Sequence, residues 1–415
     1  MTATVHVIGA GVAGLAAALR LARAGRQVKL YEAASHAGGR CRSMHDRNLD
    51  CLIDNGNHLV MSGNTATFAY LDEIGAQGEM VSAGAAAFPF LDLETGERWT
   101  VRPSRGPIPW WMLVPGRRVA GTSAAEYLSG LKLAWARPGA TVADVLGGHG
   151  ALYRRLWAPL ATAALNTDPA EGAARLLWPV LAQTFLRGER FCRPYVADRG
   201  LSLALVDPAI ATLAGLGVEI AFNRRARGLT IDGGDVRAID FTGGGVELKP
   251  TDNVVLAVPP GAARALLPSL KVPAASRAIV NAHFRLDRAP VLAAGGRFLG
   301  LVGGTAQWLF LRDCVVSVTV SAADQLAQRG NQEIAARLWH DVARALDLDP
   351  GREPPYRIIS ERRATFAQTP DAVAARPGPR VGLANLVLAG DWTDTGLPAT
   401  IESAIRSGQR AAVLI

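Results

Sequence analysis

Several features that mark common protein classes are scarce or absent in this sequence. Its 415 residues include four cysteines, none in a CxxC pair, and this wide spacing suits neither a zinc site nor a disulfide framework. No uncharged apolar run reaches the roughly 18 residues that a membrane-spanning helix needs. No basic, apolar and cleavable series precedes the first strand-like segment, so we expect the protein to stay in the cytoplasm.

Lysine is also rare, and the positive charge comes almost entirely from arginine. Lysine occurs only at Lys29, Lys132, Lys249 and Lys271, yet the formal net charge is +8. A basic surface attracts nucleic acid or an anionic membrane face. Because the basic residues form no clustered run and no nucleic-acid-binding motif is present, we expect no nucleic-acid partner. The preference for arginine, in a chain that is also rich in alanine and glycine, is explained equally well by a biased genome composition.

The first thirty residues carry the clearest motif. Residues 4–8 form an apolar strand, a GxGxxG turn follows, residues 12–24 are rich in alanine and leucine as in a helix, and residues 27–32 form a second strand. Glycines in such a turn let the backbone approach a pyrophosphate, and the helix N-terminus favours its charge. The acid that ends the second strand accepts a hydrogen bond from a ribose hydroxyl. The residues that we assign to a dinucleotide here are Gly9, Gly11, Val12, Ala13, Gly14 and Glu32.

The loop after the second strand identifies the dinucleotide by resemblance. It ends in Gly38, Gly39 and Arg40, and an acidic residue followed by Gly-Gly-Arg resembles the FAD-dependent amine oxidase and phytoene desaturase superfamily. The glycines permit close backbone approach, and Arg40 offers a charge-assisted donor to phosphate. A surface turn would also account for Arg40 taken alone. Because no cysteine follows Cys314, the thioether-linked flavin of some amine oxidases is excluded, and noncovalent FAD is expected.

The C-terminal segment resembles the closing flavin motif of the same superfamily. An apolar strand over residues 386–389 is followed by Gly-Asp. A helix is predicted to begin near Pro398, because proline is common at the first position of a helix. The resemblance implies that the amides of this helix start face the flavin and that the helix dipole stabilises its reduced, anionic form. Ser403 stands where the family usually has glycine, which crowds the helix slightly and leaves the amides in place. The residues that this motif assigns to FAD are Gly390, Asp391, Ala399, Thr400 and Ile401.

A third resemblance lies in the middle of the chain and completes the domain prediction. Residues 217–241 contain short strands, and Ala226 stands where the family often has a valine whose backbone contacts the adenine. We therefore predict an α/β protein, with a Rossmann-type FAD-binding domain and a discontinuous α+β substrate domain. The predicted boundaries are 1–85, 195–261 and 375–415 for the FAD-binding domain, and 86–194 and 262–374 for the substrate domain.

The predicted substrate domain is rich in bulky apolar residues. Helical patterns cover residues 123–136 and 151–165, and most of the aromatic residues there fit an ordinary core. The 107–115 segment has too many prolines for a long helix, and its two tryptophans, Trp110 and Trp111, are of the kind that a membrane interface favours. We therefore predict peripheral contact with the inner face of a bacterial cytoplasmic membrane.

The stretch DNGNH at residues 54–58 raises the question of a reactive site. It follows an apolar strand and precedes a Thr-Ala-Thr at residues 65–67. This pattern resembles the squalene-associated branch of the superfamily, the hydroxysqualene dehydroxylases of hopanoid synthesis. The resemblance implies a long-chain isoprenoid substrate with one allylic hydroxyl, and it places Asn55 and Gly56 beside the flavin. Reductive removal of that hydroxyl needs a proton on the leaving oxygen and a hydride at the carbon.

His58 is the first candidate for the acid, because an imidazole titrates near working pH. Asp54 would then hold the imidazole or bind the flavin ribose. Asp394 and Tyr195 are weaker candidates for the acid. A hydrogen-bonded turn with no catalytic proton accounts for the stretch equally well, since Asp, Asn and Gly are ordinary turn residues.

Two other activities use the same fold and remain alternatives. A carotenoid-type desaturase would have the same hydrophobic tunnel but would take a hydride from its substrate. An amine oxidase commonly holds a lysine beside the flavin, and the comparable stretch here, residues 277–285, has none. Because the sequence has no second GxGxxG, we expect no built-in NAD(P)H site and therefore an external electron donor.

Overall fold

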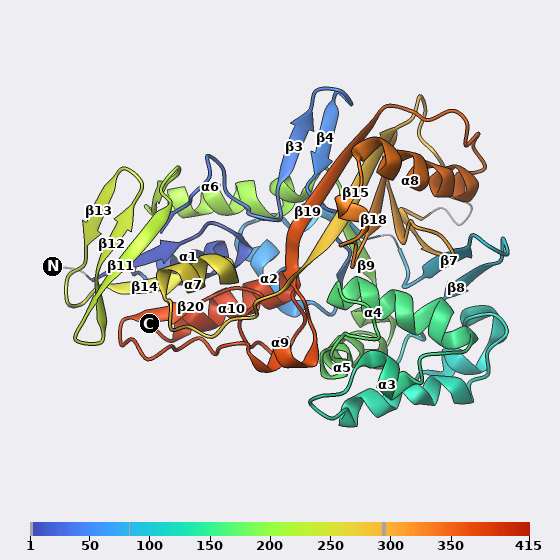
Figure 1. Cartoon of the computed structure of the whole chain (residues 1–415), viewed down its shortest axis with the longest axis horizontal. Coiled ribbons are helices and arrows are strands. Elements are labelled where there is room, and N and C mark those ends of the chain that lie inside the picture. The colour runs from blue at the N-terminus through green and yellow to red at the C-terminus, as the bar shows by residue number, and fades with distance from the viewer. Residues whose placement is uncertain (1–2, 83, 293–295) are drawn as a thin grey trace.

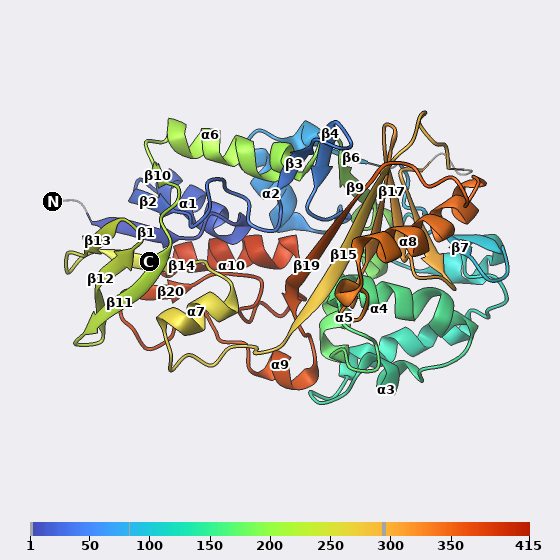
Figure 2. The same ribbon diagram turned by 45° about the horizontal axis from the view of Figure 1, so that its top comes forward.

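The computed structural model describes residues 3–82, 84–292 and 296–415, and it has two lobes (Figure 1). The first lobe is built on a parallel sheet near both chain termini. The second is built on a mostly antiparallel sheet and a group of helices. Two long strands, β15 (Ser276–Arg285) and β19 (Tyr356–Phe366), run side by side from the junction into the second lobe (Figure 2).

The first lobe holds a five-stranded sheet in which every neighbouring pair is parallel. Its strands come from the N-terminal, central and C-terminal parts of the chain, as a Rossmann-type domain assembled from three segments requires. The exact boundaries of those segments stay a prediction. From one edge to the other, the sheet runs β10 (Glu219–Ala221), β2 (Gln27–Tyr31), β1 (Thr4–Ile8), β14 (Asn253–Leu256) and β20 (Leu386–Leu388).

Successive side chains alternate between the two faces of this sheet, as the pleat of a strand requires. Val5 and Leu30 face the helices, whereas Ile8 and Tyr31 face a small sheet on the other side, where Tyr31 stacks on Phe241 at 4.4 Å. Both faces are therefore covered, which explains why the strands are apolar almost throughout. The helices around this sheet are α1 (Val12–Arg23), α2 (Thr65–Glu73), α6 (Asp207–Gly215), α7 (Pro260–Leu266) and α10 (Ile401–Val413).

Two glycines fix how α1 and α10 approach the sheet and each other. A β-carbon built on Gly408 of α10 would lie 2.1 Å from the carbonyl oxygen of Ala13 in α1, so only glycine permits this crossing. A β-carbon on Gly14 would lie 1.8 Å from the carbonyl oxygen of Gly9, so α1 starts directly against the end of β1. The N-termini of both helices consequently open on the same side of the lobe, where residues of both line one cavity.

The second lobe is built on a seven-stranded sheet covered on one face by α8 (Asn331–Leu346). Ile334, Leu338 and Val342 recur every four residues along α8 and form the buried stripe that packs on the sheet. In order, the strands are β19, β15, β18 (Val315–Val320), β17 (Trp308–Arg312), β16 (Phe298–Val302), β7 (Phe88–Asp92) and β8 (Arg98–Val101).

Helices fill the chain between β8 and the strand β9 (Pro194–Ala197). The helix predicted over 123–136 is wound instead as a 3₁₀ segment, Ala125–Trp135. At its centre, Gly130 meets the Trp157 ring, which a β-carbon would approach to 2.9 Å. The helix predicted over 151–165 forms, with a π-turn before its α-helical half. The α-helices of this region are α3 (Val142–Leu146), α4 (Ala158–Leu165) and α5 (Ala174–Gln183).

Small elements complete the chain around the junction. The hairpin β3 (Ser43–Asp46) and β4 (Cys51–Asp54) leads into the DNGNH stretch. No helix within the described ranges combines the length and apolarity needed to cross a bilayer. The remaining elements are β5 (Val60–Met61) and β6 (Met80–Ser82), which flank β9, then β11 (Ala226–Asp232), β12 (Asp235–Phe241), β13 (Gly244–Glu247) and α9 (Pro370–Ala374).

Candidate active site

One cavity of about 1190 Å³ is lined by residues of both lobes. Ligand pockets usually measure about 300–1,000 Å³, so this one has room for more than a single small molecule. Of the residues that the sequence assigned to FAD, together with the two first candidates for catalysis, His58 and Asp54, all but Gly14 and Asp54 line it. Gly14 lets α1 pack closely against β1, which is the role of the third glycine in this motif.

The glycine-rich turn forms an open cradle on the cavity wall. A β-carbon built on Gly11 meets no atom within 4 Å, and no side chain caps the start of α1. Among the residues that the structure describes, the first-turn amides of the helix therefore have no side-chain partner, as an anion-binding helix start requires. The second glycine loop lies against the first, because the Gly38 amide donates to the Ala10 carbonyl at 2.8 Å. The residues present thus fit the pyrophosphate of FAD.

Glu32 and Ala226 lie where the nucleoside end of a dinucleotide would bind. The Glu32 carboxylate accepts hydrogen bonds from the amides of Ala10 at 2.8 Å and Ala34 at 2.9 Å, one on each oxygen. These bonds fix the carboxylate and leave lone pairs for ribose hydroxyls. Ala226 lines the same part of the cavity at the start of β11, between Arg225 and Arg227.

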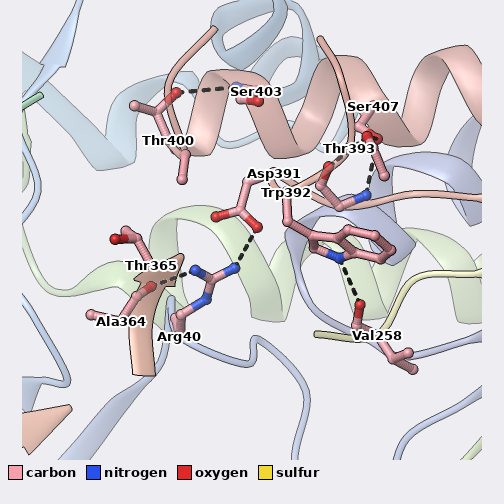
Figure 3. Close-up of polar contacts among 12 residues, drawn as sticks. Arg40, Val258, Ala364, Thr365, Asp391, Trp392, Thr393, Thr400, Ser403 and Ser407 are labelled. Carbon is pink, nitrogen blue, oxygen red and sulfur yellow. Dashed lines mark hydrogen bonds and ion pairs between the residues drawn. The ribbon is translucent and has the colours of Figure 1, made fainter. Parts of the chain in front are cut away.

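Arg40 and Asp391 come together across the cavity from opposite ends of the sequence (Figure 3). Arg40 Nη2 donates to Asp391 Oδ1 at 2.7 Å, and Nη1 donates to the carbonyl of Ala364. The nearby Asp391 carboxylate is the main cause of the raised pKa of Arg40, and burial opposes it. A guanidinium has five N–H donors, so the pair leaves donors of Arg40 for a phosphate.

The start of α10 is capped by its own sequence. Thr400 Oγ1 accepts from the Ser403 amide at 3.2 Å, an N-cap bond visible in Figure 3. The Ser403 hydroxyl pairs with Thr395 Oγ1 at 2.6 Å and is fully buried. The serine that replaces the usual glycine therefore has a partner of its own, and Ala399, Thr400 and Ile401 still line the cavity.

Trp392 is a cavity residue that the sequence analysis missed. Its indole is buried and its Nε1 donates to the carbonyl of Val258 at 2.9 Å (Figure 3). Gly390 makes room for it, because a β-carbon there would lie 2.5 Å from the indole nitrogen. Its position directly after Gly390 and Asp391 could have indicated this role, but our assignment of FAD-binding residues did not include it.

The geometry does not support a catalytic role for Asp54. Its carboxylate is buried and accepts from the hydroxyl of Ser43, the amide of Leu201 and the guanidinium of Arg312. It makes no hydrogen bond to His58 and does not line the cavity. Asp54 therefore joins the β3–β4 hairpin to the chain after β9 and to β17, instead of holding the imidazole or a ribose.

His58 lies in the cavity wall, but not as a charged acid. Burial lowers its pKa to about 4, although the negative charge of Asp54 opposes that shift. The imidazole is therefore neutral near pH 7, so it holds a single N–H rather than a spare proton. Neither weaker candidate replaces it: Tyr195 packs edge-on against Phe68 at 4.9 Å, Asp394 is exposed, and neither lines the cavity.

The part of the cavity inside the second lobe is apolar and aromatic. Such a chamber excludes water and suits a hydrocarbon chain, because burying apolar surface is favourable and these walls offer few polar partners. The sequence showed the density of bulky residues but not which of them face inward. The chamber is lined by Phe88, Phe90, Val101, Leu156, Leu160, Phe185, Trp308 and Phe310.

Comparison with known proteins agrees with this geometry. The model of the family described as flavin containing amine oxidoreductase matches residues 12–415. The hydroxysqualene dehydroxylases of Rhodopseudomonas palustris and Sinorhizobium fredii are 47% and 45% identical to this chain, and each match covers 100% of it and 98% or more of the relative. A probable zeta-carotene desaturase of Synechococcus elongatus is 22% identical over 98% of the chain.

Solved structures share the fold at lower sequence identity. Putrescine oxidase bound to putrescine has a TM-score of 0.73 and 18% identity, and the cyclohexylamine oxidase of Brevibacterium oxydans has a TM-score of 0.71 and 17% identity. Both alignments cover 100% of this chain and 98% of the other. They confirm the predicted FAD-dependent amine oxidase fold, and the close relatives give the branch. The chain belongs to the hydroxysqualene dehydroxylase family of flavin-containing amine oxidoreductases.

Proposed function

We infer that this protein removes the allylic hydroxyl of hydroxysqualene reductively to give squalene, as a step of hopanoid biosynthesis. Sequence identities of 47% and 45% to hydroxysqualene dehydroxylases, along the full length of the chain, support this choice of substrate. The observation that carries the inference from the structure is a single cavity whose wall is a dinucleotide cradle in one lobe and an aromatic chamber in the other. A cofactor and a hydrocarbon can therefore meet inside one cavity.

The reaction balances with FAD as the only redox group. One C–O bond would break and one C–H bond would form: reduced FAD would supply the hydride and be left oxidised, and a proton taken up from solvent would let the hydroxyl leave as water. The chain itself would hold the cofactor through the amides at the starts of α1 and α10 and through Arg40, Asp391 and Glu32. The aromatic chamber excludes water from the allylic carbon while positive charge develops there.

Each turnover consumes two electrons, which an outside donor has to supply. The sequence has one glycine-rich strand-turn-helix motif, at Gly9 to Gly14. We therefore propose a separate electron donor that reduces the bound FAD between turnovers.

The two alternative activities are less well supported. The desaturases are distant relatives, at about half the identity of the dehydroxylases. An amine oxidase commonly holds a lysine beside the flavin, whereas the comparable strand β15 has no lysine and presents Asn281 to the cavity. A desaturase and a dehydroxylase differ in the direction of electron flow, and that difference is measurable.

The test compares both directions with one preparation. Anaerobic, photoreduced holoenzyme mixed with hydroxysqualene should show reoxidation of the flavin, while oxidised holoenzyme mixed with squalene or phytoene should show no reduction of it. The flavin absorbance and the mass of the extracted product report the two outcomes. Reduction of oxidised flavin by phytoene, with no reaction of hydroxysqualene, would establish a desaturase instead.

We further propose that the protein rests on an anionic membrane surface through an apolar patch on the second lobe. Seven large apolar side chains are exposed on two neighbouring segments, a larger group than a soluble monomer normally leaves in water. Between residues 102 and 137 six residues are basic and only Glu126 is acidic, so the charge around the patch suits an anionic leaflet. The patch consists of Ile108, Trp110, Leu113, Val114, Leu128, Leu131 and Trp135.

The structure changes which tryptophan can take part. Trp110 is 46% exposed and Trp135 is 80% exposed, whereas Trp111 is 3% exposed and packs against Tyr127 at 5.3 Å. A narrow apolar pocket beneath the patch is lined by Trp111 and by Leu156, and Leu156 also lines the main cavity. A route from the membrane to the chamber along this pocket would suit a water-insoluble substrate.

Liposome sedimentation tests the patch with a matched control. Replacing Leu113 and Trp135 by Ser should lower binding to anionic liposomes and leave the flavin content unchanged, because both side chains are exposed. Ile231→Ser removes an apolar side chain that is 44% exposed from β11 in the other lobe (Figure 1) and should bind like the wild type. Equal sedimentation of all three proteins would exclude the patch as the contact.

A further inference from the structure

A chain of hydrogen-bonded polar side chains crosses the cavity wall between the cradle and the aromatic chamber. Asn57 Nδ2 donates to Thr319 Oγ1 at 3.0 Å, and Thr319 Oγ1 donates to Asn281 Oδ1 at 2.8 Å. Asn281 Nδ2 donates to the carbonyl of Asn55 at 3.2 Å. Asn281 and Thr319 are cross-strand partners on β15 and β18, so their pairing is fixed by the sheet.

The chemistry of this chain fixes the orientation of Asn57. Because the amide nitrogen of Asn281 faces a backbone carbonyl, its oxygen must face Thr319. The single hydrogen of the Thr319 hydroxyl is then used on Asn281, so Thr319 can only accept from Asn57. The amide nitrogen of Asn57 consequently points to Thr319, and its Oδ1 acceptor points away from the chain.

Two neighbouring groups are left with unused hydrogen-bonding capacity. Neither Asn57 Oδ1 nor the ring of His58 has a hydrogen-bond partner among the residues that the structure describes, and both side chains line the cavity. Their loop is tied to the cofactor cradle, because Asn55 Nδ2 donates to the Arg40 carbonyl at 3.4 Å. The two groups therefore lie where the cradle ends and the apolar chamber begins.

We propose that Asn57 and His58 form the binding site for the hydroxyl group of the substrate, with Thr319 and Asn281 as positioning residues. The proposal rests on the proposed function, since it presumes an isoprenoid alcohol. The substrate hydroxyl donates to Asn57 Oδ1 and accepts from the imidazole N–H of His58. A hydrocarbon chain with one oxygen is thereby fixed along its length, with its carbinol carbon at the mouth of the cradle.

Both partners suit a neutral alcohol. Burial keeps His58 neutral, so its ring carries one N–H donor and no charge that the apolar chamber would have to solvate. A hydroxyl has one hydrogen and acceptor lone pairs, which an amide oxygen and an N–H satisfy together. Squalene, which lacks the oxygen, leaves Asn57 Oδ1 and the His58 N–H without partners, so the site also favours release of the product.

Binding to oxidised holoenzyme tests the site without turnover. The perturbation of flavin absorbance is titrated with hydroxysqualene and with squalene, and the ratio of the two dissociation constants is the readout. The wild type should prefer hydroxysqualene, and Asn57→Ala should reduce that preference by roughly tenfold, the weight of one such hydrogen bond. Affinity for squalene should change little, because squalene uses the apolar walls.

A pair of substitutions at Thr319 separates positioning from loss of structure. Thr319→Val keeps the shape of the side chain but breaks the chain that orients Asn57, so the preference should fall. Thr319→Ser keeps the hydroxyl and should restore it. Both variants should bind FAD like the wild type, and they carry the test should Asn57→Ala lose flavin.

The outcomes separate this proposal from the proposed function. A wild type that turns over hydroxysqualene, with an undiminished preference in both Asn57→Ala and Thr319→Val, would overturn the hydroxyl site and leave the function intact. A wild type that neither binds nor converts hydroxysqualene would overturn both. Equal loss of preference in Thr319→Val and Thr319→Ser would assign the effect to packing and overturn the positioning role.

Discussion

Replacing Asp54 tests the conclusion that this carboxylate supports the fold and takes no part in chemistry. Asp54 Oδ1 accepts from Ser43 Oγ at 2.5 Å and from the Leu201 amide at 2.8 Å, and Oδ2 accepts from Arg312 Nη1 at 2.8 Å. The side chains of Asp54 and Arg312 are 7% and 17% exposed. Asp54→Asn keeps the size but removes the negative charge, and its N–H₂ must face either the Arg312 guanidinium or the Leu201 N–H. A nearly buried cation therefore loses its counter-charge.

Breaking a buried ion pair by changing one partner costs about 3–5 kcal/mol. Arg312 also donates to the Leu52 carbonyl at 2.7 Å and is not wholly buried, so we expect a cost near the lower end, about 3 kcal/mol. In a chain of this size, that should lower the melting temperature by roughly 3–4 °C. Turnover per bound flavin in the folded fraction should stay within about threefold of wild type, far from the loss of a catalytic group.

Thermal melts and single-turnover rates, normalised to bound flavin, provide the assay. Asp50→Asn is the matched control on the same hairpin, because the Asp50 side chain is 81% exposed and should be neutral to stability. The double variant Asp54→Asn with Arg312→Met removes both charges and should recover part of the loss. A wild-type melting temperature for Asp54→Asn, together with a hundredfold fall in rate, would refute the structural role.

Three further predictions follow from packing, charge and titration. Gly408→Ala should lower the melting temperature and the flavin content, because its β-carbon would strike the Ala13 backbone. The free energy of unfolding should fall by at least about 1–3 kcal/mol, the cost of overpacking a core. Gly215→Ala, in open space on α6, is the control. Arg40→Gln should weaken FAD retention in equilibrium dialysis, and unchanged retention would remove Arg40 from the cradle. Burial lowers the pKa of His283 to about 4 from the ordinary 6.5, so the unfolded chain alone takes up that proton between those values. Stability should therefore fall as the pH drops from about 6.5 to 4, by on the order of 3 kcal/mol from this group, and His283→Asn should make calorimetric melts less sensitive to pH in that window.

The sequence predicted what depends on short, fixed spacing. The strand, turn and helix around Gly9 and Gly11 form mainly from local backbone preferences, and Glu32 follows at the end of the next strand. The residue types and their spacing therefore predict this structure. The sequence also predicted the C-terminal flavin motif around Gly390 and Asp391. In both cases a backbone geometry that tolerates few residue types leaves a pattern in the chain.

What the sequence did not predict depends on partners far apart in the chain. Asp54 looked reactive because Leu201 and Arg312, 147 and 258 residues away, are not visible beside it in the sequence. Trp110 and Trp111 are adjacent and chemically alike, yet one is exposed and the other packs on Tyr127. Tertiary packing alone decides such cases.

The polar chain through Thr319 was missed for the same physical reason. Asn281 and Thr319 are single polar residues within strands, and only the pairing of β15 with β18 brings them together. Asn57 lies in the DNGNH stretch, far from both in the sequence, and only the fold places it on the same wall of the cavity. The low pKa of His58 has a similar origin, because the burial that causes it is a property of the folded cavity.

The most direct test of the central claim is the stoichiometry of one anaerobic turnover. Holoenzyme with fully reduced flavin is mixed with excess hydroxysqualene, the flavin oxidised is measured by absorbance, and the squalene formed is measured by mass spectrometry in the same sample. The account predicts one squalene for each flavin oxidised and none with oxidised holoenzyme. Squalene formed without a change in the flavin, or flavin oxidised without squalene, would contradict it.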